Sequence, residues 1–285
     1  MRKKLMVAGI AAGLLTVLGP GSVDTPWQAT ASACEEGAAE ERIPFSMPLA
    51  YSSDVVTKQL YHEQDGRLLI EAKTFSVTLS GKYMGYYPQL QQTLKRISKE
   101  NRRHLSKVLR SWRQDLDETY ELRRHDYALH KDEVPFTYEE SYSGLRADSH
   151  VFSFACSEYS YLGGAHPVLY YKAVTIDTRT GTILKLADVL QHTDGFAAVI
   201  ADEAIAQQEY RGQLPERDEA IRLIEQMIGD DSLVFGLDDD GMKVYFGNYA
   251  LGTYAMGTMV VNVPYGAHGD YFRPKYIFEG IRAKG

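Results

Sequence analysis

A long stripe of apolar residues at helical spacing constrains the fold of this chain more than any other feature. Large apolar side chains recur every three or four positions, at Leu90, Leu94, Ile97, Leu105, Val108, Trp112 and Leu116. This spacing places them on one face of an α-helix, whose other face carries arginines and lysines. Pro88 suits the first turn of that helix. We expect a core-facing amphipathic helix, with a partner-binding helix as the alternative. Asn101 interrupts the stripe and predicts a bend or a buried hydrogen bond.

Segments on both sides of this helix alternate between apolar and polar residues, as half-buried strands do. Before it, residues 54–61 and 67–79 are joined by an Asp65-Gly66 turn signal. After Pro135 the strand candidates are residues 138–142, 150–162, 168–177, 182–186, 233–237, 242–246 and 259–263.

Two shorter helices are expected in the second half of the chain. One covers residues 196–210 and is capped by Thr193 or Asp194, and the other covers residues 216–228. The order of elements is therefore strands, long helix, strands, two helices, strands. This order predicts an α+β fold with antiparallel sheets, packed with one long amphipathic helix in the N-terminal half and two helices in the C-terminal half.

The N-terminus has the order of a secretory signal peptide. Three basic residues precede an uncharged apolar stretch over residues 5–18, and small residues follow at Ala31-Ser32-Ala33. We expect a signal peptide over residues 1–33, a linker over residues 34–48, and a secreted or cell-envelope location. Cys34 allows a membrane tether through acylation. It also allows a disulfide with Cys156, and the alternative is that Cys156 is a buried small hydrophobic residue.

Charge is distributed unevenly along the chain. Residues 95–113 hold eight basic residues and one acid, whereas residues 194–240 hold thirteen acids and three arginines. Removal of residues 1–33 changes the formal net charge from −7 to −9. An acidic secreted protein has little reason to bind nucleic acid, so none is expected as a partner. The acidic segment favours a cationic protein partner, and a solvated helix face is the simpler interpretation of the basic segment.

Tyrosine is the main signal for a binding surface, because its ring buries area at low entropic cost and keeps a polar tip. Tyr83, Tyr86 and Tyr87 lie in a glycine-containing segment expected to be a loop. The second group comprises Tyr159 and Tyr161 together with Gly163, Gly164 and His166 of the Gly-Gly-Ala-His-Pro sequence. These eight residues are the candidate binding residues. Strand packing of the tyrosines and a backbone bend at His166 are the alternatives.

Catalytic and metal motifs are weak. His62-Glu63 lacks the second histidine of a metalloprotease helix, and Asp238-Asp239-Asp240-Gly241 predicts a hairpin turn rather than a calcium loop. No metal ligand, cofactor or catalytic residue is therefore assigned. Glu139, Glu140 and Glu158 are acids near aromatic residues, a setting compatible with a glycosidase if two of them meet in a cleft.

Several short motifs, in order, resemble a two-module extracytoplasmic family. They are Tyr161–Pro167, Asp177, Thr180-Gly181, residues 184–190, the Tyr245–Gly257 stretch and Val261–Tyr265, preceded by a module over residues 51–154 with Tyr87-Pro88 before the long helix. The family is similar to the lysozyme-binding ectodomain of the anti-sigma-V factor and to the region in front of a peptidoglycan deacetylase domain. On this basis we expect an N-terminal α+β module over residues 49–160 and a C-terminal α+β module over residues 161–285. Sharing of strands between the two modules is left open.

The resemblance implies a non-catalytic binding module for a lysozyme-like cationic protein or a cell-wall glycan. Two alternatives stay open from the residues: an envelope hydrolase that uses carboxylates in a cleft, and a structural envelope component. Paired carboxylates in a closed cleft would favour the hydrolase, and a broad aromatic patch without them would favour binding.

Overall fold

The computed structural model describes residues 48–62, 66–81, 84–127, 135–162, 166–207, 214–248, 250–251 and 257–278, with backbone alone at residue 115 and residues 117–127. The expected signal peptide, the linker up to residue 47 and Cys34 lie outside these residues, so those predictions stay predictions. No helix in the described ranges is long and apolar enough to cross a membrane.

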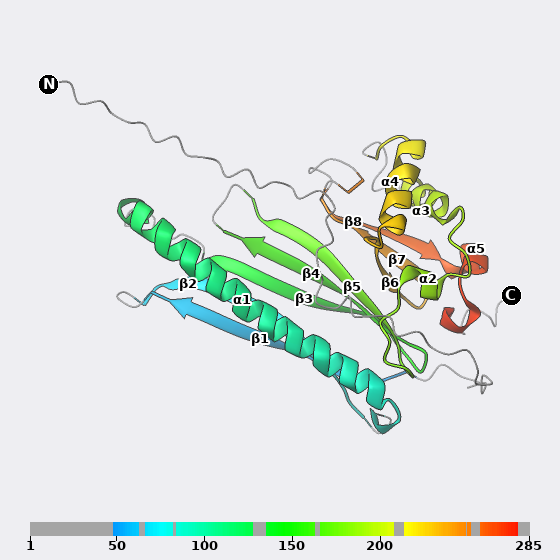
Figure 1. Cartoon of the computed structure of the whole chain (residues 1–285), viewed down its shortest axis with the longest axis horizontal. Helices are drawn as coiled ribbons and strands as arrows, with labels where there is room; N and C mark the ends of the chain where they lie inside the picture. The colour runs from blue at the N-terminus through cyan, green and yellow to red at the C-terminus, as the bar shows by residue number, and fades with distance from the viewer. Residues whose placement is uncertain are drawn as a thin grey trace.

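Two mostly antiparallel sheets and several helices make up the described part of the chain, which confirms the predicted α+β class (Figure 1). The larger sheet has the order β1-β2-β3-β4-β5, with β1 (Tyr51–Tyr61), β2 (Leu68–Leu79), β3 (Phe136–Ala147), β4 (Val151–Tyr161) and β5 (Val168–Asp177). Only the β2–β3 pair is parallel within this sheet, because the long helix α1 (Pro88–Tyr127) connects β2 to β3.

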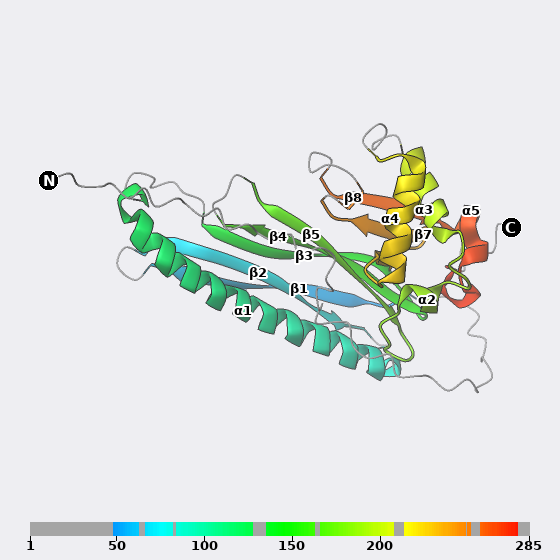
Figure 2. The ribbon, with the colours of Figure 1, turned by 45° about the horizontal axis from the view of Figure 1, so that its top comes forward.

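The smaller sheet has the order β6-β7-β8 and carries the C-terminal helices. The elements of this half are α2 (Leu186–Val189), α3 (Phe196–Ala206), α4 (Arg217–Gly229), β6 (Val234–Leu237), β7 (Gly241–Phe246), β8 (Met259–Pro264), α5 (Tyr265–His268) and the short 3-10 turns η4 (Gly269–Tyr271) and η5 (Pro274–Tyr276). A further 3-10 turn, η1 (Met84–Tyr86), precedes α1. Helix α1 lies along one face of the larger sheet, and the smaller sheet with α3 and α4 lies on the other side (Figures 1 and 2).

The apolar stripe of α1 is buried against the larger sheet, as predicted. Its first half packs on Phe75, Val77, Phe152 and Phe154, and its second half packs on Ile70, Ala72 and Tyr138. The inward-facing residues of β2 thus change from even to odd positions between Thr74 and Phe75. Asn101 lies at this change, is 2 % exposed, and donates a hydrogen bond from Nδ2 to the Phe75 carbonyl at 3.2 Å. The buried hydrogen bond expected for Asn101 is therefore confirmed.

Strand β6 packs on the face of the larger sheet opposite α1. A Cβ atom at Gly236 would lie 2.4 Å from Leu145 Cδ1 and 3.2 Å from Ser153 Oγ, so a larger residue there requires the Leu145 side chain to move. The Leu237 amide donates to Ser153 Oγ at 2.9 Å across the same contact. Strand β5 lies after residue 161 yet completes the larger sheet, so the two expected modules share a sheet.

A buried arginine, ion-paired within the larger sheet's side of the protein, also contacts the C-terminal segment. Arg146 of β3 and Asp148 are 4 % and 3 % exposed, and Nε of the arginine lies 2.6 Å from Oδ2 of the aspartate. Arg146 Nη1 also donates to the Tyr276 carbonyl at 2.5 Å. Burial raises the pKa of Asp148, but the Arg146 charge and two backbone hydrogen bonds outweigh it and hold that pKa below its usual value.

Two local predictions are wrong. The strand expected at residues 182–186 is a single bridge at Ile183 followed by α2, because the Asp188 carboxylate accepts from the Lys185 amide at 2.9 Å and closes a helical turn. Helix α3 is not capped by a Thr193 or Asp194 side chain. Its N-cap is Gly195 at φ +77°, a left-handed conformation that glycine adopts without strain.

Candidate functional site

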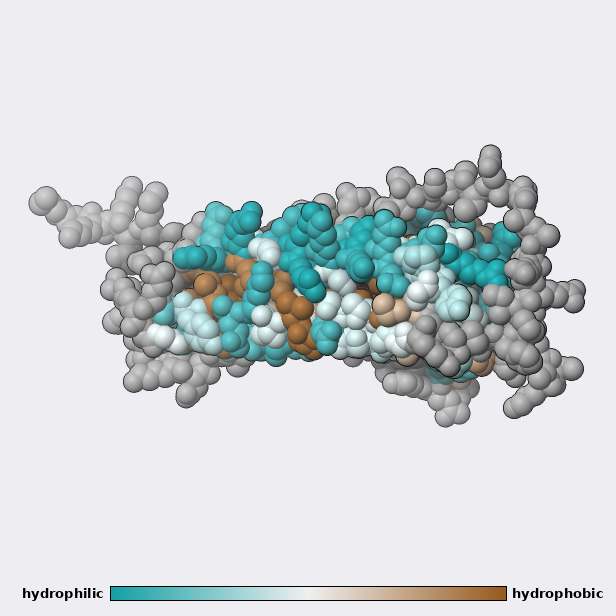
Figure 3. Space-filling model, turned by 90° about the horizontal axis from the view of Figure 1, so that it is seen from below, coloured by the Kyte–Doolittle hydropathy of each residue, from teal (hydrophilic) through white to brown (hydrophobic). Residues whose placement is uncertain are grey.

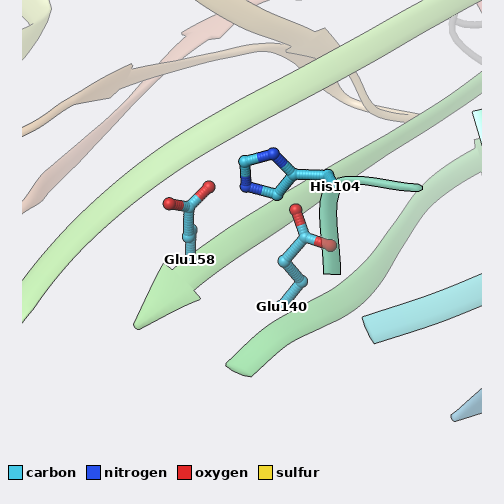
Figure 4. A group of neighbouring side chains, drawn as sticks. All are labelled: His104, Glu140 and Glu158. Carbon is cyan, nitrogen blue, oxygen red and sulfur yellow. The ribbon is translucent and has the colours of Figure 1, made fainter. Parts of the chain in front are cut away.

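A polar cluster lies between α1 and the larger sheet. Thr74, after which the inward-facing residues of β2 change from even to odd positions, contacts this cluster. His104 comes from α1, Glu140 from β3 and Glu158 from β4, and one ligand atom of each lies within 4.8 Å of the others (Figure 4). Glu140 and Glu158 are direct partners in the β3–β4 register. In Figure 4 the imidazole and both carboxylates point toward one another.

Lys172 of β5 supplies a positive charge to this cluster. Its Nζ lies 3.4 Å from Glu140 Oε1 and also forms a short ion pair with Glu158. Thr74 Oγ1 donates to the second oxygen of Glu140, which is only 4 % exposed. Burial would lower the pKa of the Lys172 ammonium, but Glu158 and Glu140 outweigh it and raise that pKa above its ordinary value. The ammonium is therefore charged at neutral pH and compensates both carboxylates.

One histidine and two glutamates are a donor set that suits Zn²⁺ or another divalent cation. The Lys172 ammonium, however, already occupies the position between the carboxylates, and it would repel a second cation at this range. We therefore interpret the cluster as an ion network in which one ammonium bridges two carboxylates beneath α1. The carboxylate pair lies beneath α1, where the side chains of Glu140 and Glu158 are 2 % and 18 % exposed.

A second candidate site is the tip of the β4–β5 hairpin. Large apolar and aromatic side chains are exposed there, to 56 % at Tyr170, 49 % at Leu162 and 38 % at Val168. Tyr159 and Tyr161 are partly exposed on the same hairpin, and Tyr159 lies opposite Leu169 in the register. We call these six residues the hairpin patch. By strand alternation Val168 and Tyr170 lie on the α1 face of the sheet, Tyr159, Tyr161 and Leu169 lie on the face of the smaller sheet, and Leu162 follows the end of β4. Exposed clusters of this kind mark interaction sites more often than isolated apolar residues do.

The predicted binding residues do not form one site. Tyr159 and Tyr161 lie in the hairpin patch, and the exposed His166 lies in the adjoining loop, where Nδ1 is 3.2 Å from the Pro167 carbonyl. Gly163 and Gly164 lie outside the described residues. β3 pairs parallel with β2 and antiparallel with β4, so Tyr161 is level with Glu71. Tyr161 and Leu79, which precedes η1, therefore lie at the two different ends of the sheet.

The other tyrosine group is at that opposite end. Tyr86 in η1 is 77 % exposed. Tyr87 is 7 % exposed and belongs to the core, and burial raises the pKa of its hydroxyl, so its side chain serves packing. Tyr83 lies outside the described residues. An open pocket of about 250 Å³ lies beside this group, lined by Pro48, Leu49, Ala50, Leu79, Ser80, Gly81 and Met84.

Cys156 is a free, fully buried cysteine beneath α1. Burial, with the neighbouring Glu140 charge, raises the pKa of its thiol, so the thiolate is disfavoured at neutral pH. This position agrees with the buried-hydrophobe interpretation.

Sequence reasoning missed His104 and Lys172 as members of the polar cluster. His104 lies three residues after Asn101 on α1, which was a usable signal that the polar interruption of the stripe extends along the helix. Lys172 had no such signal, because it meets the glutamates only through the β4–β5 pairing.

Comparison with known families gives two matches. Residues 78–169 match the family described as Deacetylase PdaC, and residues 190–266 match the family described as Protein of unknown function (DUF3298). The two matches follow one another along the chain, in agreement with the two-module order of the motifs. No curated protein matches the chain.

One solved structure shares the fold. A DUF3298 family member from Bacteroides fragilis superposes with a TM-score of 0.60 at 15% identity, covering 84% of this chain and 99% of that chain. A DUF3298 family protein from Pseudomonas aeruginosa has a TM-score of 0.49 at 13% identity, covering 81% of this chain and 97% of that chain. At 15% identity, the likeness to the Bacteroides fragilis protein shows a shared fold alone.

Proposed function

We propose that this protein is a secreted or envelope-tethered, non-catalytic binding module whose hairpin patch contacts its ligand. The observation that carries the proposal is the gathering of exposed Tyr170, Leu162 and Val168, and of the partly exposed Tyr159 and Tyr161 on the other face, at one end of the larger sheet. Tyrosine-rich surfaces on rigid strands bind with little loss of conformational entropy. The signal-peptide pattern and the wall-related family match support an envelope location.

A lysozyme-like cationic protein is the first ligand class. The acidic C-terminal segment favours it, because residues 194–240 hold thirteen acids against three arginines. The exposed Asp218 and Asp240 lie 3.9 Å from Arg217 and 3.5 Å from Lys243. The described arginines of this segment are already paired, Arg217 with Asp202 at 2.6 Å and Arg222 with Glu219. The remaining acids therefore leave a negative field that would speed association with a basic protein. The resemblance to a lysozyme-binding ectodomain supports the same class.

A cell-wall glycan is the second ligand class, and the tyrosines favour it. Exposed aromatic rings on strands offer apolar faces with a polar rim, and sugar rings have matching apolar faces and hydroxyls. The acidic segment adds nothing to the binding of a neutral glycan, so the two classes differ in their dependence on salt.

Calorimetric titration distinguishes them. The purified protein is titrated with lysozyme and, separately, with soluble peptidoglycan fragments, each at low and at moderate salt. Saturable lysozyme binding of defined stoichiometry that persists at moderate salt supports the protein ligand. Salt-independent binding of the fragments alone supports the glycan. Binding of lysozyme that disappears at moderate salt reflects only charge attraction, and absence of binding to both ligands contradicts the proposal.

A further inference from the structure

The outer edge of the larger sheet is an unpaired strand. β1 pairs with β2 on one side, and no strand in the described ranges pairs with its other side. It is eleven residues long and exposed along most of its length, with Val55 72 % exposed. Figure 3 looks at the side of the molecule where β1 and α1 lie, and shows hydrophobic surface between hydrophilic surroundings. A long exposed edge of this kind is a template for pairing with another strand.

The sequence of β1 is complementary to itself when two copies run antiparallel. With Val56 placed opposite the same residue of a second copy, Asp54 of each strand meets Lys58 of the other. Two opposite-charge pairs thus form symmetrically about the centre. Val55 meets Thr57 of the second copy, a pair of β-branched residues, and such cross-strand pairs stabilise a sheet.

The faces of the sheet are consistent with this register. Val56 pairs with Thr74 in β2 and packs beneath α1, so even-numbered residues of β1 share the α1 face. Asp54 and Lys58 are both even, and therefore lie on one face in both copies. Lys58 Nζ donates to Ser106 Oγ of α1 at 2.9 Å, so the lysine lies on this face. The two-fold axis at Val56 places both α1 helices on the same face of a continuous sheet.

We propose that the protein self-associates through antiparallel β1–β1 pairing centred on Val56, and that the occupant of the exposed edge is a second copy of this chain. The charge pattern excludes the parallel in-register arrangement, because that arrangement would place Asp54 against Asp54 and Lys58 against Lys58. The dimer would leave the hairpin patch, which lies on β4 and β5 across the sheet, free for ligand.

Charge reversal tests the register directly. Asp54→Lys gives an edge with two lysines and Lys58→Asp gives one with two aspartates, so each variant alone should weaken the dimer by about tenfold or more. An equimolar mixture of the two variants should form a heterodimer, because each lysine then meets an aspartate. The double variant with both changes should recover the wild-type dimer.

Sedimentation equilibrium measures the dissociation constants, and native mass spectrometry identifies the heterodimer by its mass. Glu225→Lys on the exposed surface of α4 makes the same change of net charge as Asp54→Lys and should leave the dimer unchanged. Circular dichroism confirms that each variant is folded. A wild-type protein that stays monomeric at all concentrations, or a dimer indifferent to both single reversals, overturns the proposal. So does failure of the mixed variants to pair while each is folded.

Discussion

Glu140 and Glu158 lie directly opposite each other on β3 and β4, and the Lys172 ammonium contacts both carboxylates. One oxygen of each carboxylate lies within 4.8 Å of the other. Two like charges this close repel strongly unless a cation lies between them. Lys172 supplies that cation from the next strand, while His104 covers the group from α1. The side chains that join α1 to β3, β4 and β5 are thus coupled electrostatically.

Replacement of Lys172 by methionine should destabilise the fold by about 3–5 kcal/mol, because the buried Glu140 carboxylate loses its counter-charge. Urea denaturation at pH 7 measures the change in the free energy of unfolding. Lys185→Met is the matched control, since the Lys185–Asp231 pair is about half exposed and should contribute less than about 1 kcal/mol. Equal effects of the two variants would contradict the assigned role of Lys172.

The same replacement should convert the cluster into a metal site. Without the ammonium, the imidazole of His104 and the two carboxylates can share a divalent cation. We expect Zn²⁺ to raise the thermal midpoint of Lys172→Met more than that of the wild type. Adding His104→Ala to that variant should abolish the increase. A wild-type protein stabilised as much as the variant would show that Lys172 does not compete with the cation.

The Arg146–Asp148 pair predicts acid sensitivity. The folded pKa of Asp148 lies below its unfolded value of about 3.9. The contribution of the pair is therefore fully present above that unfolded value, and it is lost as the pH falls through the lower folded pKa. Asp148→Asn should lose about 3–5 kcal/mol at pH 7 and show a flatter fall of stability below pH of about 4.

The free energy of unfolding, measured from pH 7 to pH 2, checks this prediction. Asp218→Asn, at a side chain that is 96 % exposed, should stay within about 0.5 kcal/mol of wild type across the range. If the free energy of unfolding of Asp148→Asn falls with decreasing pH as steeply as that of wild type, other carboxylates govern acid unfolding.

Close approach of the two sheets predicts a steric effect at Gly236. Gly236→Val should cost about 1–3 kcal/mol, because the side chain must displace Leu145 and Ser153. Gly247→Val is the control, as a Cβ atom there meets nothing within 4 Å. Thermal unfolding followed by circular dichroism compares the two, and equal midpoints would contradict the close packing of β6 on the larger sheet.

Local patterns predicted local structure well. The stripe from Leu90 to Leu116 predicted the buried face of α1, and Pro88 marked its start. These features depend on side chains within a few residues of one another. Asn101 also signalled the buried polar contact, because a polar residue on an apolar stripe needs a partner.

Long-range pairing was not predictable from the same patterns. The two glutamates, His104 and Lys172 come from four elements, and their contact depends on the β3–β4–β5 register. The parallel β2–β3 pair joins segments separated by α1, and no local signal specifies it. Tyr87 was assigned to a loop surface because its neighbours are glycines and tyrosines, but its ring fills the core beside Leu90.

The central claim is that the hairpin patch binds the ligand. The most direct measurement is a calorimetric titration, with lysozyme and with peptidoglycan fragments, of Tyr159→Ser/Tyr161→Ser beside wild type and the control Tyr86→Ser. We predict that the ligand bound by wild type loses about tenfold or more in affinity for the double variant, since aromatic anchors contribute about 2 kcal/mol or more at binding hot spots. Tyr86→Ser, at the opposite end of the sheet, should bind as wild type does. Unchanged affinity of the folded double variant would contradict the claim.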